Sequence, residues 1–328
     1  MKTFTSGQAA IQADSQANSR LPLVSVIIPA FNAARFLPRA LASVAAQSYP
    51  ADRIETIVID DGSTDDTSAI ARSFGERMPG LQVFSQLNQG VSAARNLGIA
   101  TSTGELIAFL DADDRWLPDK IAAQVEVFQA DPTVGLIHSG FAFVDQGGRA
   151  LPDWPRQSRL DQGDVLLEFL CDFFLITSAV MVPKAILESV GDFDESLKVG
   201  EDNELFLRIV SAFRIGCSPL TLLERTVRPD SLSRQDFDLD ASVDLATIEH
   251  FLARHPDFFL QHRERINAHL ASYLYGYGYR LLDEGQVSQA RRMLRRSLGR
   301  RWSLPAARSL LRSFLPDALA RSGRAILR

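Results

Sequence analysis

Residues 54–65 read Ile-Glu-Thr-Ile-Val-Ile-Asp-Asp-Gly-Ser-Thr-Asp, and this stretch indicates the fold most directly. Its first half is a short β-branched apolar run, which is typical of a strand buried on both faces of a parallel sheet. Its second half consists of acids, glycine and serine, which favour turns. The stretch therefore predicts a buried strand that ends in a polar turn.

The same pattern continues on both sides of this stretch. Short apolar strands alternate with amphipathic helical segments, with strands expected at 24–29, 54–59, 81–84 and 106–110 and helices at 34–46, 65–74 and 91–100. This alternation predicts an α/β, Rossmann-like fold with a mainly parallel sheet flanked by helices on both faces. Ligands of such folds bind at the carboxyl ends of the strands.

The remainder of the chain predicts three regions. Residues 1–22 are polar and predict a disordered leader, because they offer little apolar surface to offset the entropy of ordering. Residues 23–235 predict the α/β domain, with a weak strand at 134–144 and helices at 178–190 and 201–212. The β pattern ends after Arg234, so residues 236–328 predict a C-terminal α-helical extension with a basic tail.

Composition narrows the class of protein. The net charge of -5 argues against a nucleic-acid binder, which needs a basic docking face. Only two cysteines are present, Cys171 and Cys217, and neither has a His or Cys neighbour at a metal-ligand spacing, which favours a reduced intracellular compartment. No uncharged apolar run approaches the ~20 residues that span a bilayer. We therefore expect a cytoplasmic protein.

Acidic clusters follow the predicted strands, at 60–61 and 111–114, and a third, 201–202, opens a later helix. Any one cluster could serve only as a turn former or helix cap. The second cluster has three acids in four residues after an apolar strand, and a cation would relieve their repulsion. Carboxylates on such a turn suit Mg²⁺ or Mn²⁺, which would leave coordination sites for phosphate oxygens and stabilise a departing diphosphate.

Four segments, taken in order, resemble the signatures of the family-2 inverting glycosyltransferases with the GT-A fold. They are Val-Ser-Val-Ile-Ile-Pro-Ala-Phe-Asn (24–32), Val-Ile-Asp-Asp-Gly-Ser-Thr-Asp (58–65), Asn-Gln-Gly-Val-Ser-Ala-Ala-Arg-Asn (88–96) and Phe-Leu-Asp-Ala-Asp-Asp (109–114). The resemblance covers residues 23–234, and four blocks in order after predicted strands are far more specific than one.

The resemblance implies a metal-dependent hexosyltransferase that uses a nucleotide-sugar, with UDP-sugar the expected donor. Asp61 would read the edge of a uracil-type base, and Asp113 would be the direct metal ligand for Mn²⁺ or Mg²⁺. Arg95 and Asn96 would hold the donor or order the metal loop. The remaining residues implied on the nucleotide-sugar side are Pro29, Ala30, Asn32, Asp60, which supports the turn, and Asp111, which approaches the ribose.

On the acceptor side, Gly-Asp-Phe-Asp-Glu (191–195) and the following Glu201-Asp202 resemble the family motif whose aspartate is the general base. Asp202 would take the proton of the acceptor hydroxyl as it attacks with inversion. An acid in the first turn of a helix is otherwise a favourable cap. Further candidates for the acceptor or diphosphate side are Glu201, Arg228, Arg234 and Trp116, which would either stack on a sugar or anchor its loop in the core.

The resemblance further implies a glycan or lipid-linked hydroxyl as the acceptor, in surface-polysaccharide biosynthesis. Residues 291–328 carry eleven arginines and one acid, so this basic C-terminal tail either lies on an anionic membrane surface, at the inner face, or packs on the protein. Two alternatives remain. A catalytically silent sugar-nucleotide-binding regulatory module would not need Asp202, and a nucleotidyltransferase would usually carry a glycine-rich basic loop where this chain has Pro-Ala-Phe-Asn.

Overall fold

The computed structural model describes residues 21–152, 158–228 and 237–314. Nearly all of the predicted leader, Arg234 and the last fourteen residues of the basic tail lie outside the described residues. The chain divides into two compact units, one formed by Met1–Phe169 with Phe173–Gln235 and the other by Leu170–Asp172 with Asp236–Arg328.

The first unit is built on an eight-stranded sheet with the order β3-β2-β1-β4-β7-β6-β8-β5. Its first half is parallel, as predicted, and consists of β1 (Val24–Ala30), β2 (Ile54–Asp60), β3 (Leu81–Ser85) and β4 (Leu106–Phe109). The parallel register aligns Ala30 with Asp60, so the polar loops that follow β1 and β2 emerge side by side. The predicted ligand edge of the sheet therefore forms here.

The second half of the sheet is mixed. Strand β7 (Met181–Pro183) lies antiparallel between β4 and β6 (Leu136–Val144), whereas β8 (Ile215–Thr226) runs parallel to β6. The short β5 (Arg115–Trp116) pairs antiparallel with β8. The predicted helix at 178–190 is wrong in its first half, because Met181, Val182 and Pro183 are buried sheet residues and the helix α7 begins only at Lys184.

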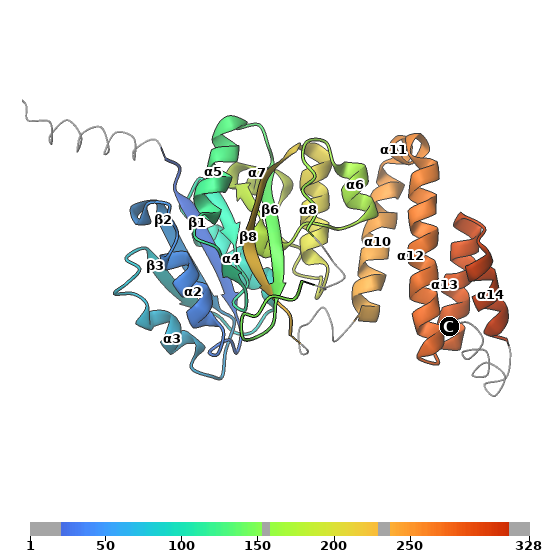
Figure 1. Ribbon diagram of the computed structural model, residues 1–328, viewed down its shortest axis with the longest axis horizontal. Coiled ribbons are helices and arrows are strands. Elements are labelled where there is room, and N and C mark those ends of the chain that lie inside the picture. Colours follow the sequence, from blue (N-terminus) through green and yellow to red (C-terminus); the bar gives the residue numbers. More distant parts are fainter. Residues whose placement is uncertain (1–20, 153–157, 229–236, 315–328) are drawn as a thin grey trace, which may run out of the picture. The chain divides into compact units, whose positions relative to one another are not determined.

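Helices cover both faces of the parallel half (Figure 1). Side chains alternate along a strand, so Ile57 and Ile59 pack with α4 (Val91–Thr101), while Val58 lies in the other core layer with α2 (Leu37–Ala45). Helix α4 packs very closely, since a Cβ at Gly98 would lie 2.4 Å from Ile27 Cγ2. The other helical elements of this unit are η1 (Ala51–Arg53), α3 (Thr67–Ser73), α5 (Lys120–Ala130), η2 (Thr177–Ala179), α7 (Lys184–Val190) and α8 (Glu201–Ala212). Helix α6 (Leu166–Cys171) is divided between the two units, because Leu170 and Cys171 belong to the second.

The second unit is helical, as the loss of the β pattern predicts. Its elements are α10 (Phe237–Arg254), α11 (Pro256–Gln261), α12 (Arg263–Asp283), α13 (Val287–Arg300) and α14 (Leu304–Arg312). Leu270, Leu274 and Leu281 of α12 and Leu294 of α13 are fully buried. Within the described ranges, no helix combines the length and apolar character that a membrane crossing requires.

Candidate active site

The loops after β1 and β2 interlock through Asn32. Its backbone has a φ of 48°, which a non-glycine residue rarely adopts. The Asn32 side chain accepts a hydrogen bond of 2.9 Å from the backbone N–H of Thr64, while its own backbone N–H donates to Ser63 Oγ at 2.9 Å. Asp60 accepts from the backbone N–H of Ser63 at 3.0 Å. Asn32 and Asp60 therefore hold one rigid pair of loops at the end of the sheet.

Pro29 and Ala30 complete β1 beside these loops. Pro29 has no N–H to donate, and the pairing of β1 with β4 ends at Ile27, so Pro29 pairs with β2 alone. Ala30 accepts a hydrogen bond of 2.8 Å from the backbone N–H of Asp61. Both residues lie at the predicted position, directly below the interlocked loops.

Asp61 organises the loop that leads into α4. Its carboxylate is 4% exposed and accepts from Gln86 Nε2 at 2.7 Å and from the backbone N–H groups of Gln89 and Gly90, each at 2.9 Å. Two of these bonds go to Oδ1 and one to Oδ2. Oδ2 therefore retains acceptor capacity beyond the bonds within the described residues.

The acidic turn after β4 places its three carboxylates in different environments. The side chains of Asp111 and Asp113 are 36% and 25% exposed, whereas Asp114 is 3% exposed. Burial, followed by repulsion from Asp113 and Asp111, raises the pKa of Asp114 to about 8. Asp114 Oδ1 accepts from the backbone N–H of Thr226 at 2.9 Å, so this carboxyl anchors the turn to the end of β8.

Asp113 pairs with Arg228, with 3.1 Å between its Oδ2 and Nη1 of Arg228. Burial and the neighbouring charge of Asp111 raise the pKa of Asp113, and Arg228 opposes that rise. The carboxylate is thus salt-bridged but remains partly open to solvent. Arg228 also lies 4.6 Å from the ring centre of Phe36, and the other candidate on this segment, Arg234, lies outside the described residues.

A buried arginine joins the acidic turn to α8. Arg95 is 4% exposed and donates to Glu201 Oε1 at 2.7 Å and to Asp111 Oδ1 at 2.9 Å. Burial alone would lower the pKa of Arg95, but Asp111, Glu201 and Asp202 outweigh it and raise that pKa. Arg95 therefore ties the acidic turn to the start of α8 through Asp111 and Glu201.

Glu201 is not open to an acceptor, contrary to one expectation from the sequence. It is 8% exposed, and its carboxylate is bound to Arg95. Burial and the adjacent Asp202 raise the pKa of Glu201, while Arg95 lowers it. Glu201 is a structural partner of Arg95, and Asp202 is the more exposed of the two acids.

The short helix η2 links Asp202 to the acidic turn. Thr177 Oγ1 donates to Asp202 Oδ2 at 2.9 Å, and the next residue, Ser178, accepts from the backbone N–H of Asp111 at 3.1 Å. The sequence did not single out Thr177 or Ser178, because nothing local marks a hydroxyl that meets a carboxylate 25 residues away. The two acidic clusters are thus held by neighbouring residues of one element.

Three side chains from β5 and α5 support η2 from the core. Successive carbonyls at 178, 179 and 180 accept from Trp116 Nε1 at 2.7 Å, Gln124 Nε2 at 2.7 Å and Lys120 Nζ at 3.2 Å. Trp116 is 1% exposed, so its ring cannot stack on a sugar, and the core-anchoring role is the correct one. Polar residues at 120 and 124, one helical turn apart among apolar neighbours, were the available sequence signal.

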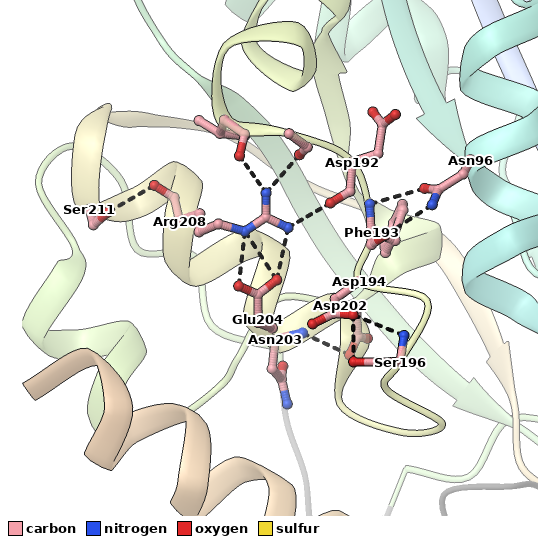
Figure 2. A network of polar contacts seen from close by, with 12 residues as sticks. Asn96, Asp192, Phe193, Asp194, Ser196, Asp202, Asn203, Glu204, Arg208 and Ser211 are labelled. Atoms are coloured by element: carbon pink, nitrogen blue, oxygen red, sulfur yellow. Dashed lines mark hydrogen bonds and ion pairs between the residues drawn. The ribbon is translucent and has the colours of Figure 1, made fainter. Parts of the chain in front are cut away.

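Figure 2 shows how the loop before α8 is fixed. Arg208 pairs with Glu204 at 2.8 Å and donates to the backbone carbonyls of residues 190, 191 and 192 at 2.6–2.7 Å. The side-chain amide of Asn96 donates to the carbonyl of Phe193 at 2.9 Å and accepts from its N–H at 3.0 Å. These contacts hold the segment Gly-Asp-Phe-Asp-Glu, and with it the start of the helix that carries Asp202.

The charge balance of the site fits a divalent cation. Among the described residues, no three His, Cys, Asp or Glu side chains are arranged to hold a metal ion by themselves. Mg²⁺ and Mn²⁺ sites that act on diphosphates use only one or two carboxylates, with water and phosphate oxygens as the other ligands. Asp113 is a partly exposed hard donor beside a second, partly exposed carboxylate, Asp111, so the turn offers the one or two carboxylates that such a site uses.

Sequence comparison matches residues 25–189 to the family described as Glycosyl transferase family 2. An uncharacterised glycosyltransferase of Rickettsia typhi is 34% identical over 204 residues, which make up 60% of this chain and 62% of that protein. The match thus spans about three fifths of the relative's length.

Two solved structures have a similar fold. The 1–349 fragment of Staphylococcus aureus TarS, in complex with UDP-GlcNAc, has a TM-score of 0.58 at 19% identity over 92% of both chains. The mannosyltransferase PcManGT from Pyrobaculum calidifontis, in complex with GDP-Man and Mn²⁺, has a TM-score of 0.59 at 22% identity over 94% of this chain and 81% of its own. The fold is that of the GT-A enzymes. With the family match over half of its length, the chain belongs to glycosyltransferase family 2.

Proposed function

We propose that this protein transfers a sugar from a nucleotide-sugar to a hydroxyl acceptor with inversion at the anomeric carbon. The observation that carries the proposal is the link from the acidic turn to Asp202 through Arg95, Thr177 and Ser178. This link brings a candidate cation site and a candidate base into one hydrogen-bonded assembly at the carboxyl ends of the strands. In a metal-dependent inverting transfer, the base acts on the acceptor hydroxyl while the cation stabilises the departing diphosphate, so the two functions belong in one site.

The donor that we propose is a UDP-sugar. TarS binds UDP and UDP-GlcNAc, and the acceptor capacity left on Asp61 Oδ2 suits the single N–H on the edge of a uracil ring. PcManGT binds GDP-Man, so a guanine donor is the competing outcome. Pro29, Ala30 and Asn32 would line the same end of the site, and Asp111 would approach the ribose.

Asp113 would hold Mn²⁺ or Mg²⁺, and PcManGT with bound Mn²⁺ supports this assignment. When bound, the ion supplies Lewis-acid stabilisation of the departing diphosphate. Arg228 lies beside Asp113 and offers a second positive charge on the same side. Its planar guanidinium suits phosphate oxygens.

Asp202 would act as the general base. Its carboxylate lies in the first turn of α8, with Oδ2 held by Thr177, and Oδ1 accepts the adjacent backbone N–H of Asn203 at 2.8 Å. These bonds fix the plane of the carboxylate, so that a lone pair can meet the acceptor hydroxyl in one orientation. The proton of that hydroxyl would pass to Asp202 as the oxygen attacks the sugar.

We further propose that residues 23–235 form the catalytic domain and that residues 236–328 bring the enzyme to its acceptor. Residues 291–314 carry eight arginines and no acid, which supports peripheral association with an anionic membrane surface and a lipid-linked acceptor in surface-polysaccharide synthesis. The compartment would be the cytoplasm, at the inner face of the membrane.

The test of the transfer function is a donor panel. Thermal denaturation with UDP, GDP and other nucleoside diphosphates, each with and without Mn²⁺, should give the largest stabilisation with UDP and Mn²⁺ together. Transfer from the matching nucleotide-sugar is then read by mass. Stabilisation by no nucleoside diphosphate would contradict the proposal, and binding without any transfer would favour the silent regulatory module.

A further inference from the structure

The second unit contains an open pocket at the end of α11, the start of α12 and the end of α13, with a volume of about 460 Å³. Three arginines, Arg263, Arg300 and Arg301, line it with one acid, Glu264, and with Leu260, Gln261 and Asn267. All of these residues belong to one compact unit, so the pocket is a property of the helical region alone.

Positive charge exceeds negative charge in this pocket. Arg300 is held in place by Glu249 at 3.0 Å, and the same carboxylate is already shared with Arg296 at 2.6 Å. Arg263 and Arg301 are exposed and form no ion pair within the described part of the chain. The start of α12, at Arg263, adds the positive end of a 21-residue helix.

Exposed apolar side chains flank the same pocket. Leu260, in its wall, is 65% exposed, and Trp302, which follows Arg301, is 71% exposed. Farther along, Leu304 and Leu311 are 47% and 70% exposed on one face of α14, where Arg308 lies between them. Arginines interspersed with exposed tryptophan and leucine are typical of a helical surface that lies in the headgroup layer of a membrane.

We propose that this pocket binds the phosphate of an anionic phospholipid while Leu260 and Trp302 enter the boundary between headgroups and acyl chains. The inference rests on the membrane association proposed above and assigns it to one site. Charge complementarity selects the occupant, because guanidinium groups pair with phosphate oxygens in a bidentate manner. An acidic protein partner would also satisfy the arginines, but the exposed Trp302, Leu304 and Leu311 follow the basic pocket without an acid among the described residues 291–314, which suits an anionic headgroup layer above acyl chains.

The experiment is flotation of the full chain with vesicles of phosphatidylcholine alone or mixed with phosphatidylglycerol. The double variant Arg263→Gln/Arg301→Gln removes two charges from the pocket. Its matched control, Arg292→Gln/Arg295→Gln, removes two exposed charges from α13 outside the pocket. Wild type should float only with the anionic vesicles, and the pocket variant should bind at least about tenfold more weakly than the control variant.

Each outcome decides a separate point. Equal loss in the two double variants would overturn the pocket and leave a diffuse basic face as the membrane contact. No flotation of wild type with anionic vesicles would overturn both the pocket and the proposed membrane association, while the donor panel would still judge sugar transfer. Trp302→Ser should also weaken binding to the anionic vesicles. Unchanged flotation of that variant would overturn the proposal that Trp302 enters the boundary between headgroups and acyl chains.

Discussion

At the scale of single residues, catalysis is expected to depend on Asp202. Asp202→Asn keeps the shape of the side chain and its bond from Thr177 but cannot accept a proton. Transfer should fall by about 10²–10⁴-fold, which is the usual contribution of a positioned base. The affinity for UDP with Mn²⁺, measured by calorimetry, should stay within about twofold, because the base acts on the acceptor hydroxyl and not on the nucleotide.

Replacing Thr177 tests the role of Asp202 with a smaller expected loss of activity. Thr177→Val removes the donor to Asp202 Oδ2, so kcat should fall roughly tenfold with the donor KM unchanged, and Thr177→Ser should restore the rate. Loss of nucleotide binding in Asp202→Asn, or an unchanged kcat in Thr177→Val, would mean that this pair is structural.

Replacing Asp113 and replacing Asp114, neighbours in the acidic turn, should have different effects on the stabilisation by Mn²⁺. Asp113 is partly exposed and is the proposed metal ligand, so Asp113→Asn should abolish the extra thermal stabilisation that Mn²⁺ gives in the presence of UDP. Asp114 is buried with a pKa of about 8 and is therefore largely protonated at pH 7. An amide has the same shape and still accepts from Thr226, so Asp114→Asn should keep the Mn²⁺ effect. Equal loss in both variants would contradict the assignment to Asp113.

At the scale of elements, α5 supports η2 through the buried Lys120, and the free-energy cost of burying this amine depends on pH. Lys120 is fully buried, and desolvation lowers the pKa of its amine well below the ordinary value. Its Nζ lies 3.8 Å from the ring centre of Trp116, which would favour the charged form, but no carboxylate is among the causes of its shift, so desolvation is the larger effect. The folded chain therefore binds the proton of Lys120 less tightly than the unfolded chain does.

The sign follows from proton linkage. Stability rises with pH wherever the unfolded state binds more protons, so the cost of Lys120 is full below its lowered folded pKa and disappears above its unfolded pKa. Relative to wild type, Lys120→Met should therefore lose its advantage, at about 1.4 kcal/mol per pH unit at most, as the pH rises from 7 toward 10. Urea unfolding across this range, with Lys184→Met as the matched control, would test it, and parallel curves for wild type and Lys120→Met would contradict it.

Elements with strong local patterns were predictable from the sequence. The β-branched runs identified β1, β2 and β4, and the acids at 60–61 and 111–114 were correctly expected at the ends of strands. Strand β7 was missed because three residues carry no periodicity of their own and are ordered by pairing with β4 and β6. The support of η2 was equally invisible, since Lys120 and Val180 are 60 positions apart in sequence. The sequence could not choose between the two roles of Trp116, nor show that Glu201 is closed to an acceptor, because only tertiary packing determines that they are buried.

At the scale of the whole molecule, charge divides along the chain. Residues 291–328 carry a net charge of about +10 within a chain whose net charge is -5, so the first 290 residues carry the balance of about -15. An anionic surface would attract the basic end and repel the acidic remainder. Association through the basic end alone should therefore weaken steeply with salt, because the screening length falls from about 10 Å at 0.1 M to about 3 Å at 1 M.

A chain that ends at residue 235 separates the two proposed roles. It keeps the interlocked loops, the acidic turn and the η2 link, all of which lie in the first unit, so it should still be stabilised by UDP with Mn²⁺. It lacks every arginine of the basic segment, so it should not float with anionic vesicles at any salt concentration. Loss of nucleotide binding would mean that the catalytic domain needs the helical region to fold, and flotation of the shortened chain would place the membrane contact in the acidic part.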